Sequence, residues 1–118
     1  MRLKSIDGAW DFYNNWRKEN SFSPALKKNV KITRKGWSHI FNKNRNETDK
    51  YRRLKLLPYA KELIELSTTI QNIKQSDETT FIAIEHVFNL ETNYKVRVIL
   101  ESKNNSDYTF LSVMDKKI

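Results

Sequence analysis

The chain of 118 residues has no cysteine, and it carries only two glycines, two prolines and two histidines. Without cysteine it can form no disulfide scaffold, thiolate nucleophile, zinc ribbon or iron–sulfur cluster. Gly8 and Gly36 are too few for a Walker loop or a dinucleotide-binding fingerprint, since both motifs need several close backbone approaches. Two histidines cannot form a three-histidine metal site. The composition therefore argues against most classes of small-molecule enzyme.

Long hydrophobic runs are also missing. No apolar stretch approaches the roughly 20 residues that a membrane-spanning helix needs, so we expect no membrane partner. The chain opens on polar sequence after Met1, which predicts no secretory signal. We expect a cytoplasmic location, or delivery into the cytosol of a target cell as part of a larger protein. The length predicts a single domain over residues 1–118.

Positive charge is abundant and is concentrated in one segment of the chain. The formal net charge is +8, and residues 27–55 hold eleven Lys and Arg against only Glu47 and Asp49. Such segregation suits a polyanion-binding surface, because each neutralised phosphate releases a counterion. It therefore predicts a nucleic-acid partner. An acidic protein, such as an inhibitor or immunity protein, fits the same surface, and a basic face that only aids solubility is the third interpretation.

Helical periodicity dominates the first two thirds of the sequence. An apolar and aromatic stripe predicts a helix over residues 8–19, with that stripe in the core. Thr33 is a candidate N-cap for a second helix that runs to about residue 44. A third helical stretch breaks and restarts at Pro58, and its apolar stripe continues to about residue 75.

The pattern then changes to alternation, which is typical of strands. A short strand is predicted at residues 29–33, and three longer strands follow at residues 79–89, 94–101 and 108–115. Turn-rich segments separate the last three, so they form an antiparallel meander. The predicted fold class is α+β, with N-terminal helices packed on an antiparallel sheet that ends in a three-stranded meander.

Four residues of the second predicted helix form a candidate anion and base site. Arg34 and Lys35 lie in its first turn, where free backbone N–H groups and two cations suit a phosphate. His39 lies on the same face as Lys35 and Lys43. Two like charges oppose protonation of the imidazole and favour the neutral form, which can act as a general base. An exposed histidine without a special role is the alternative.

A second polar row is predicted across the meander. Pairing through the turns places Arg97 opposite Ser112 on one side and opposite His86 on the other. Arg97 stands between hydrophobic neighbours, which is an unusual choice for a purely structural strand. The row is either part of a site or a solvent-facing edge.

Four segments of the chain resemble one protein family. They are ITRKGWSHI at residues 32–40, RRLKLLPYAKELIE at 52–65, YKVRVILE at 94–101 and YTFLSV at 108–113. In this order they resemble the barnase/EndoU/colicin/RelE-like ribonuclease superfamily, above all its phage-associated and colicin D-like branches. Members place a histidine on a helix before a meander, with basic residues and a Ser or Thr on the last strands. The likeness covers roughly residues 30–115.

The resemblance implies a ribonuclease toxin and assigns roles to four residues. His39 matches the catalytic imidazole, Lys35 its basic neighbour, and Arg97 and Ser112 the residues on the strands. The implied reaction is metal-independent cleavage of tRNA or other structured RNA by the neighbouring 2′-hydroxyl, with no cofactor. His39 would be the general base or acid. Lys35 and Arg97 would hold the phosphate oxygens, and Ser112 would donate a hydrogen bond to one of them.

The basic segment supplies the expected RNA contacts. We predict binding of tRNA or other structured RNA through this surface, whose candidate residues are Arg34, Lys43, Arg52, Arg53 and Lys55. In colicin D-like members an aromatic residue can follow the last-strand serine by two positions, whereas this chain has Met114 there.

Two other functions remain open at this point. A non-catalytic nucleic-acid-binding module could insert the basic second helix into a groove. A metal-dependent nuclease could use the Glu101-x-Lys103 pair with an upstream carboxylate, from Asp77, Glu85 or Glu91, to hold a divalent cation. One Glu-x-Lys pair is about the number that this composition gives by chance.

Overall fold

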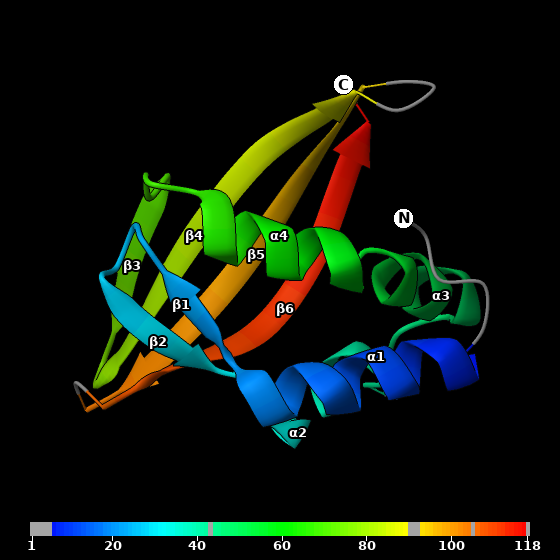
Figure 1. Cartoon of the computed structure of the whole chain (residues 1–118), viewed down its shortest axis with the longest axis horizontal. Coiled ribbons are helices and arrows are strands. Elements are labelled where there is room, and N and C mark those ends of the chain that lie inside the picture. The colour runs from blue at the N-terminus through cyan, green and yellow to red at the C-terminus, as the bar shows by residue number, and fades with distance from the viewer. Residues whose placement is uncertain (1–5, 43, 90–92, 105, 118) are drawn as a thin grey trace.

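The computed structural model describes residues 6–42, 44–89, 93–104 and 106–117, and within them four helices precede most of a six-stranded sheet (Figure 1). The α+β fold class is therefore confirmed. The elements, in chain order, are α1 (Ile6–Glu19), β1 (Ser21–Ser23), β2 (Lys28–Lys31), α2 (Arg34–Ile40), α3 (Glu47–Lys55), α4 (Leu57–Leu66), β3 (Asn72–Ser76), β4 (Thr79–Asn89), β5 (Asn93–Lys103) and β6 (Tyr108–Lys117).

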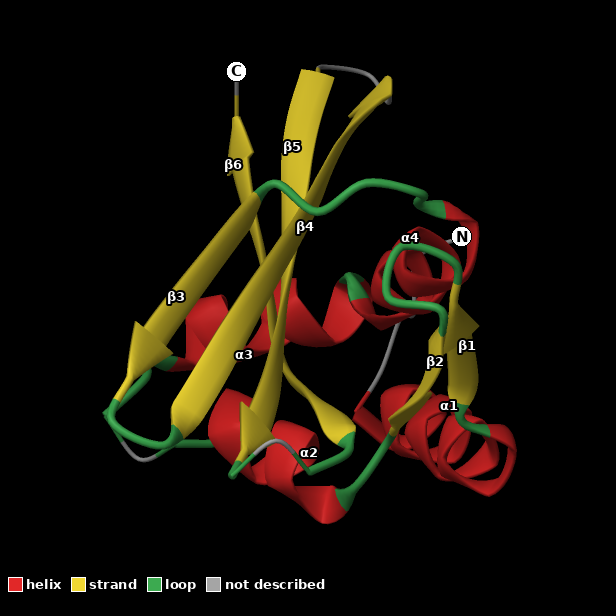
Figure 2. Cartoon of the chain, turned by 90° about the vertical axis from the view of Figure 1, so that its left-hand side faces the viewer, coloured by secondary structure: helices red, strands yellow, loops and turns green. Residues whose placement is uncertain are grey.

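The sheet has the strand order β1-β2-β6-β5-β4-β3 (Figure 2). Strands β3 to β6 form an antiparallel meander, whose last three strands were predicted. Strand β2 pairs with β6 in parallel, so the sheet is mixed rather than wholly antiparallel. This pairing joins only Val30 with Tyr108 and Lys31 with Thr109. Within the described strands, the rest of β6 therefore has a strand neighbour on one side only, and α2 and α3 pack against β6 there.

Helix α4 covers one face of the sheet, as its position in front of β4 and β5 shows (Figure 1). Pro58 stands at its start, where the fixed φ of proline suits a first helical turn. Ala60, Leu63 and Ile64 recur at helical spacing and are buried against the alternate apolar residues of β5. Helix α4 therefore covers only one face of these strands, and we call the opposite face the open face.

Two predicted helices are longer in the sequence pattern than in the structure. The second helix ends at Ile40 rather than near residue 44. The apolar stripe after Pro58 ends at Leu66, and the strand β3 stands where the pattern predicted helix to residue 75. A run of hydroxyl and β-branched residues at positions 67–70 favours extended backbone over helix. Asp77 then turns the chain with a φ of 54°, which pairs β3 with β4.

The aromatic stripe of α1 lies in the core, as predicted. Tyr13 and Trp16 are fully buried, and the hydroxyl of Tyr13 donates to the carbonyl of Thr33 at the N-cap of α2. Gly36, in the first turn of α2, lies against Tyr13 and Phe110 of β6. A Cβ atom there would stand 2.5 Å from the Tyr13 hydroxyl and 2.9 Å from the Phe110 carbonyl oxygen. The missing side chain of Gly36 therefore sets how closely α2 approaches the sheet.

We predict that Gly36→Ala lowers the free energy of unfolding by about 1–3 kcal/mol, because the added methyl group overpacks a site with backbone on one side. Helix propensity alone would make the alanine variant about 1 kcal/mol more stable than the glycine protein. The expected change in the free energy of unfolding therefore has the opposite sign. Equilibrium denaturation measures the change. The control is Ser38→Ala at an exposed position of α2, which should stay within about 0.5 kcal/mol. An equally stable Gly36→Ala protein would contradict the close approach.

Candidate functional site

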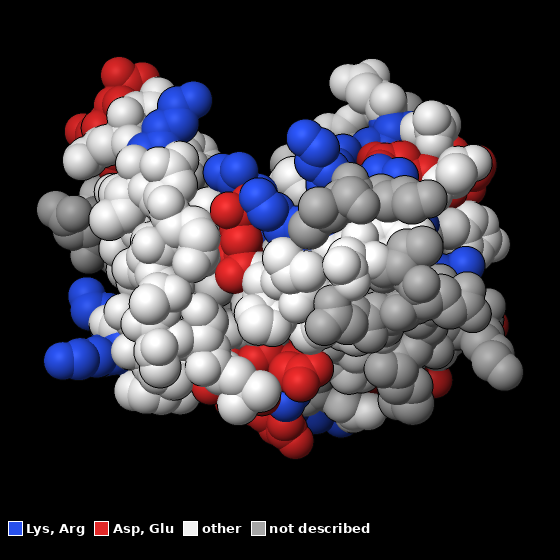
Figure 3. Space-filling model, turned by 90° about the horizontal axis from the view of Figure 1, so that it is seen from above, with Lys and Arg blue, Asp and Glu red and all other residues white. Residues whose placement is uncertain are grey.

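Side chains from α2 and four strands line a pocket of about 330 Å³, which we call the sheet pocket. Its lining includes His39 from α2, Arg97 from β5 and Ser112 from β6. Since Val96 and Val98 point to the buried core, the alternation of the strand directs Arg97 to the face opposite α4. Seen from above, the molecule is notched on that side, and Lys and Arg side chains gather along the notch (Figure 3).

The imidazole of His39 is partly buried and is held by Arg45, which lies in the turn between α2 and α3. Arg45 Nη2 lies 2.9 Å from His39 Nε2, and Arg45 Nε donates to the His39 carbonyl oxygen at 3.0 Å. A guanidinium group can only donate, so Nε2 is the acceptor and the imidazole proton is on Nδ1. This contact is compatible only with a neutral imidazole.

The electrostatic surroundings act in the same direction. Burial lowers the pKa of His39, and the positive charges of Arg45 and Arg53 lower it further, while Glu101 opposes them only in part. The sequence predicted a neutral His39 because of Lys35 and Lys43. The arginines are the larger influence, and Lys35 is the weakest cation of this set.

Asp49 anchors the arginines beside His39. Its Oδ2 atom lies 3.3 Å from Arg45 Nη1 and accepts from Arg53 Nε at 3.0 Å. Although burial alone raises the pKa of Asp49, the two guanidinium groups outweigh it and hold the pKa below its ordinary value. The backbone N–H of Asp49 donates to the side chain of the N-cap residue Asn46, which fixes the first turn of α3. The carboxylate therefore stays ionised and positions both arginines.

Arg53 reaches from α3 to β6 and holds the predicted serine. Its Nη1 atom donates to Ser112 Oγ at 2.8 Å and to the Val113 carbonyl oxygen at 3.2 Å. Ser112 is 2% exposed, and its hydroxyl accepts this hydrogen bond while its own proton can be donated into the pocket. Arg53 was expected only as an RNA contact, whereas the structure places it beside the predicted site.

The predicted row of three residues across the meander is wrong in register. Arg97 pairs with Glu85 on one side and Met114 on the other, and Ser112 lies opposite Ile99. A register shift between Ile99 and Leu100 accounts for part of the error, since a bulge displaces the pairing by one residue. Arg97 and Ser112 nevertheless share a pocket, because both side chains lie on the open face.

His86 does not belong to this face. It is paired with Val96, a core residue, and it lines a separate pocket with Leu63 and Leu66 of α4. Its ring stacks edge-on against Phe88 at 5.0 Å between centroids. Successive residues of a strand point to opposite faces. Glu85 is the partner of Arg97, so the next residue, His86, lies on the other face and is not part of the polar row.

Lys35 is bound by a carboxylate instead of standing free beside His39. Its ammonium group makes an ion pair and hydrogen bond with Glu101 of β5, and this contact raises the pKa of Lys35. Glu101 is buried, and the pairing satisfies its charge. Lys35 does not line the sheet pocket.

Of the remaining predicted binding residues, the described ones lie on α3 and at the start of α2. Arg34 is exposed and does not line the sheet pocket, and Lys43 lies outside the described residues. Arg52 makes ion pairs with Asp115 and Asp49, and Lys55 is exposed. Sequence reasoning left Arg45 and Asp49 out of the site, although positions 45, 49 and 53 follow the i, i+4 spacing of one helix face.

A metal site was not predicted for this chain. Among residues 6–42, 44–89, 93–104 and 106–117, no three His, Cys, Asp or Glu side chains converge as metal ligands. Two of the carboxylates considered for a metal-dependent nuclease are paired with cations. Glu101 makes an ion pair with Lys35, and Glu85 Oε2 lies 3.6 Å from Arg97 Nη1. Glu91 lies outside the described residues. Within the same ranges, no helix is long and apolar enough to cross a membrane.

Comparison of the chain with protein-family models, with curated proteins and with solved structures finds no match.

We predict that His39 titrates below its ordinary pKa of 6.5, and that Arg45→Ala raises this pKa only in part because burial remains. NMR titration of the imidazole signals, assigned with His86→Ala, measures both values. Because the unfolded chain takes up a proton that the folded chain resists, the free energy of unfolding should fall as the pH drops below about 6.5. His39→Gln should remove this fall. A wild-type His39 that titrates at or above 6.5 would contradict the assignment.

Proposed function

We propose that this protein is a metal-independent endoribonuclease that cleaves tRNA or another structured RNA by attack of the 2′-hydroxyl, with His39 as general acid and base. The observation that carries the proposal is that His39, Arg97 and Ser112 line one pocket, while Arg45 contacts the imidazole and Arg53 contacts the serine from beside it. Cleavage of this kind needs a base for the 2′-hydroxyl proton and cations for the charge on the phosphorane. Both kinds of group are present on one face.

His39 begins the reaction in the protonation state that a base requires. Burial and the neighbouring guanidinium groups hold its pKa below the ordinary value, so the imidazole is neutral at pH 7. In the absence of substrate, however, Arg45 Nη2 occupies Nε2 at 2.9 Å. A phosphate is a stronger acceptor for guanidinium than a neutral imidazole. Arrival of the substrate phosphate would therefore draw Arg45 from Nε2 and release the base.

The bond changes follow from these positions. The 2′-oxygen forms a bond to phosphorus as His39 Nε2 takes its proton, and the bond from phosphorus to the 5′-oxygen breaks. The imidazolium or water returns a proton to the leaving oxygen, which gives a 2′,3′-cyclic phosphate and a 5′-hydroxyl. Arg97, with its side chain 38% exposed, would bind one non-bridging oxygen, and the Ser112 hydroxyl would donate to another.

Lys35 has a smaller part in this scheme than the resemblance implies. Its ammonium group would reach a phosphate only by leaving Glu101, whose buried carboxylate would then be unpaired. Arg45 and Arg53 can fill the role of basic neighbours to His39 while each keeps its ion pair with Asp49. The proposal therefore keeps Arg97 and Ser112 on the non-bridging oxygens and gives the supporting positive charge, which the resemblance assigns to Lys35, to the two arginines anchored by Asp49.

The toxin interpretation extends the proposal to a biological setting. A ribonuclease of this charge, free in the cytosol or delivered into it, would damage its host unless it is restrained. An inhibitor or immunity protein that is acidic over its contact surface would associate rapidly with the basic segment at residues 27–55.

We predict that cleavage of total RNA persists in EDTA and leaves 2′,3′-cyclic phosphate and 5′-hydroxyl ends. The reason is that the proposed groups, an imidazole and three guanidinium groups, work without a metal ion. Phosphatase and kinase treatment of the fragments identifies the ends. If chelation stops cleavage and magnesium restores it, the metal-dependent nuclease is correct instead. If RNA is bound but stays intact, the chain is a binding module.

We predict that His39→Ala lowers the cleavage rate about 10²- to 10⁴-fold while RNA affinity changes less than about twofold, because affinity rests on many phosphate contacts. Arg97→Ala should lose activity and also bind RNA more weakly. His86→Ala, on the other face of the sheet, is the matched control and should cut at nearly the wild-type rate. Circular dichroism verifies folding. A folded His39→Ala protein with wild-type activity would refute the role of this imidazole.

A further inference from the structure

The sheet pocket continues into two further hollows that the function above does not use. It shares Arg97 and Met114 with a hollow of about 440 Å³, the middle pocket, which Arg52 and Arg53 also line. The middle pocket shares Arg52, Asp115 and Lys116 with a larger hollow of about 840 Å³, the outer pocket. The three hollows are therefore adjacent and follow one another in a row that leads away from His39.

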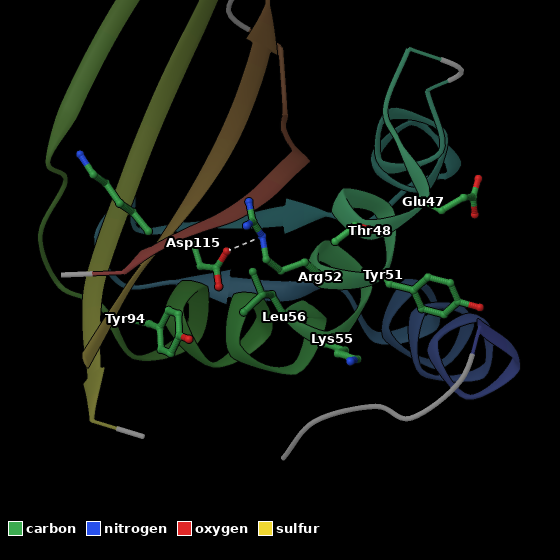
Figure 4. Close-up of a pocket in the computed structure, with 9 residues that line it drawn as sticks. Glu47, Thr48, Tyr51, Arg52, Lys55, Leu56, Tyr94 and Asp115 are labelled. Atoms are coloured by element: carbon green, nitrogen blue, oxygen red, sulfur yellow. Dashed lines mark ion pairs between the residues drawn. The ribbon is translucent and has the colours of Figure 1, made fainter. Parts of the chain in front are cut away.

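This row of hollows crosses the side of β6 that has no strand neighbour. Beyond Thr109, β6 pairs with β5 alone among the described strands, and α3 lies on its other side. Arg52 reaches across this gap to Asp115 (Figure 4), and both residues line the middle pocket as well as the outer pocket. The sheet pocket lies on the open face of the sheet, and the outer pocket extends past the edge of β6 toward α3 and the start of α4.

The outer pocket combines cations with aromatic rings. Tyr94 of β5 and Tyr51 of α3 stand at opposite ends of it, and Tyr51 is 41% exposed (Figure 4). Arg52, with its side chain 57% exposed, and the exposed Lys55 and Lys116 supply positive charge. Cations that track a phosphate backbone, together with aromatic faces for bases, are the two components of single-strand recognition.

Asp115 positions Arg52 at the outer pocket. Its side chain is 10% exposed, and its Oδ1 atom is buried with no hydrogen-bond donor among the described residues. Arg52 Nε lies 2.9 Å from this atom as an ion pair, off the geometry of a hydrogen bond. This ion pair holds the Arg52 guanidinium beside the outer pocket.

We propose that the outer pocket binds unpaired nucleotides of an RNA whose chain runs from the sheet pocket through the middle pocket and over the edge of β6. The bases stack on Tyr51 and Tyr94, and the phosphates lie against Arg52, Lys55 and Lys116. A duplex cannot occupy this pocket, since its bases are already stacked and paired. The adjacency to a cleaved bond rests on the proposed function, whereas the binding of single-stranded RNA does not.

The test measures binding of a labelled, unpaired 12-nucleotide RNA by fluorescence anisotropy, with His39→Ala as the parent protein so that the RNA stays intact. Tyr51→Leu and Tyr94→Leu keep apolar bulk and remove the aromatic faces. Together they should weaken binding at least about tenfold, and Tyr51→Leu alone about fivefold, in line with the usual loss per stacked base. Lys55→Ala should reduce the salt slope of log affinity by about 1.

Matched controls lie away from the three hollows. Phe22→Leu removes an aromatic ring that is 54% exposed on β1, and Lys18→Ala removes an exposed charge on α1. Both should leave affinity within about twofold. The same RNA annealed into a duplex should bind more weakly than the single strand, and the tyrosine substitutions should not affect it. Circular dichroism verifies folding, and if the double variant fails to fold, the exposed Tyr51→Leu position carries the test.

The outcomes separate this inference from the proposed function. If the wild type cuts no RNA but single-stranded binding depends on both tyrosines, the enzymatic proposal fails and the outer pocket stands. If the wild type cuts RNA while the tyrosine variants bind and cut like the wild type, the outer pocket is refuted and the enzymatic proposal stands. Equal affinity for duplex and single strand also overturns the inference.

Discussion

The short pairing between β2 and β6 is the constraint on which the site depends. Two residues of β6 pair with β2, and the rest of the strand has β5 alone beside it among the described strands. Helices α2 and α3 occupy the side that this arrangement leaves, so their side chains reach the open face of the sheet from its edge. A fully paired β6 would have placed another strand between His39 and Ser112. The close approach at Gly36 has the same origin, because α2 packs directly against Phe110.

Within that arrangement, Asp49 determines where the positive charge is held. Its carboxylate contacts Arg45 and Arg53, and each of these arginines contacts the candidate site on its other side. An ionised carboxylate between two guanidinium groups offsets their mutual repulsion, which is why they can share a small region without a bound anion. The Asp49 contacts therefore hold both arginines in place, and in the proposed reaction only the contact of Arg45 with His39 Nε2 would have to change when a phosphate binds.

The sequence predicts the fold better than it predicts the register. The change from helical to alternating periodicity gives the α+β class, and β4 begins and ends at the residues that the pattern indicated. Strand β3 was missed because isoleucines at positions 70 and 73 continue a helical stripe, whereas the hydroxyl residues before them favour extended backbone. The partner of β6 could not be predicted, since a parallel pair of two residues leaves no local pattern.

The candidate site shows the same division between local and distant information. Local charge predicts a neutral His39, whereas in the structure burial is the first cause of its lowered pKa, and Arg45 and Arg53 act more strongly than Lys35. Arg97 and Ser112 share a pocket with His39, but a bulge changes which residues they face. The spacing of Arg45, Asp49 and Arg53 is that of one helix face and could have been recognised in the sequence. The contact between Arg53 and Ser112 could not, because it joins residues far apart in the chain.

Guanidinium groups, rather than ammonium groups, are what this geometry requires. Arg45 contacts the backbone oxygen of His39, the ring nitrogen Nε2 and the Asp49 carboxylate at once, from three different nitrogen atoms. Arg53 likewise reaches Asp49 with Nε and β6 with Nη1. A lysine carries one nitrogen on a flexible stem and could serve only one such direction at a time. Two lysines of the basic segment lie elsewhere: Lys35 pairs with Glu101, and Lys55 is exposed beside the outer pocket. The planar forks of Arg45 and Arg53 contact the imidazole and orient the serine, while Lys55 stays exposed beside the outer pocket, where we propose that it contacts a flexible phosphate chain.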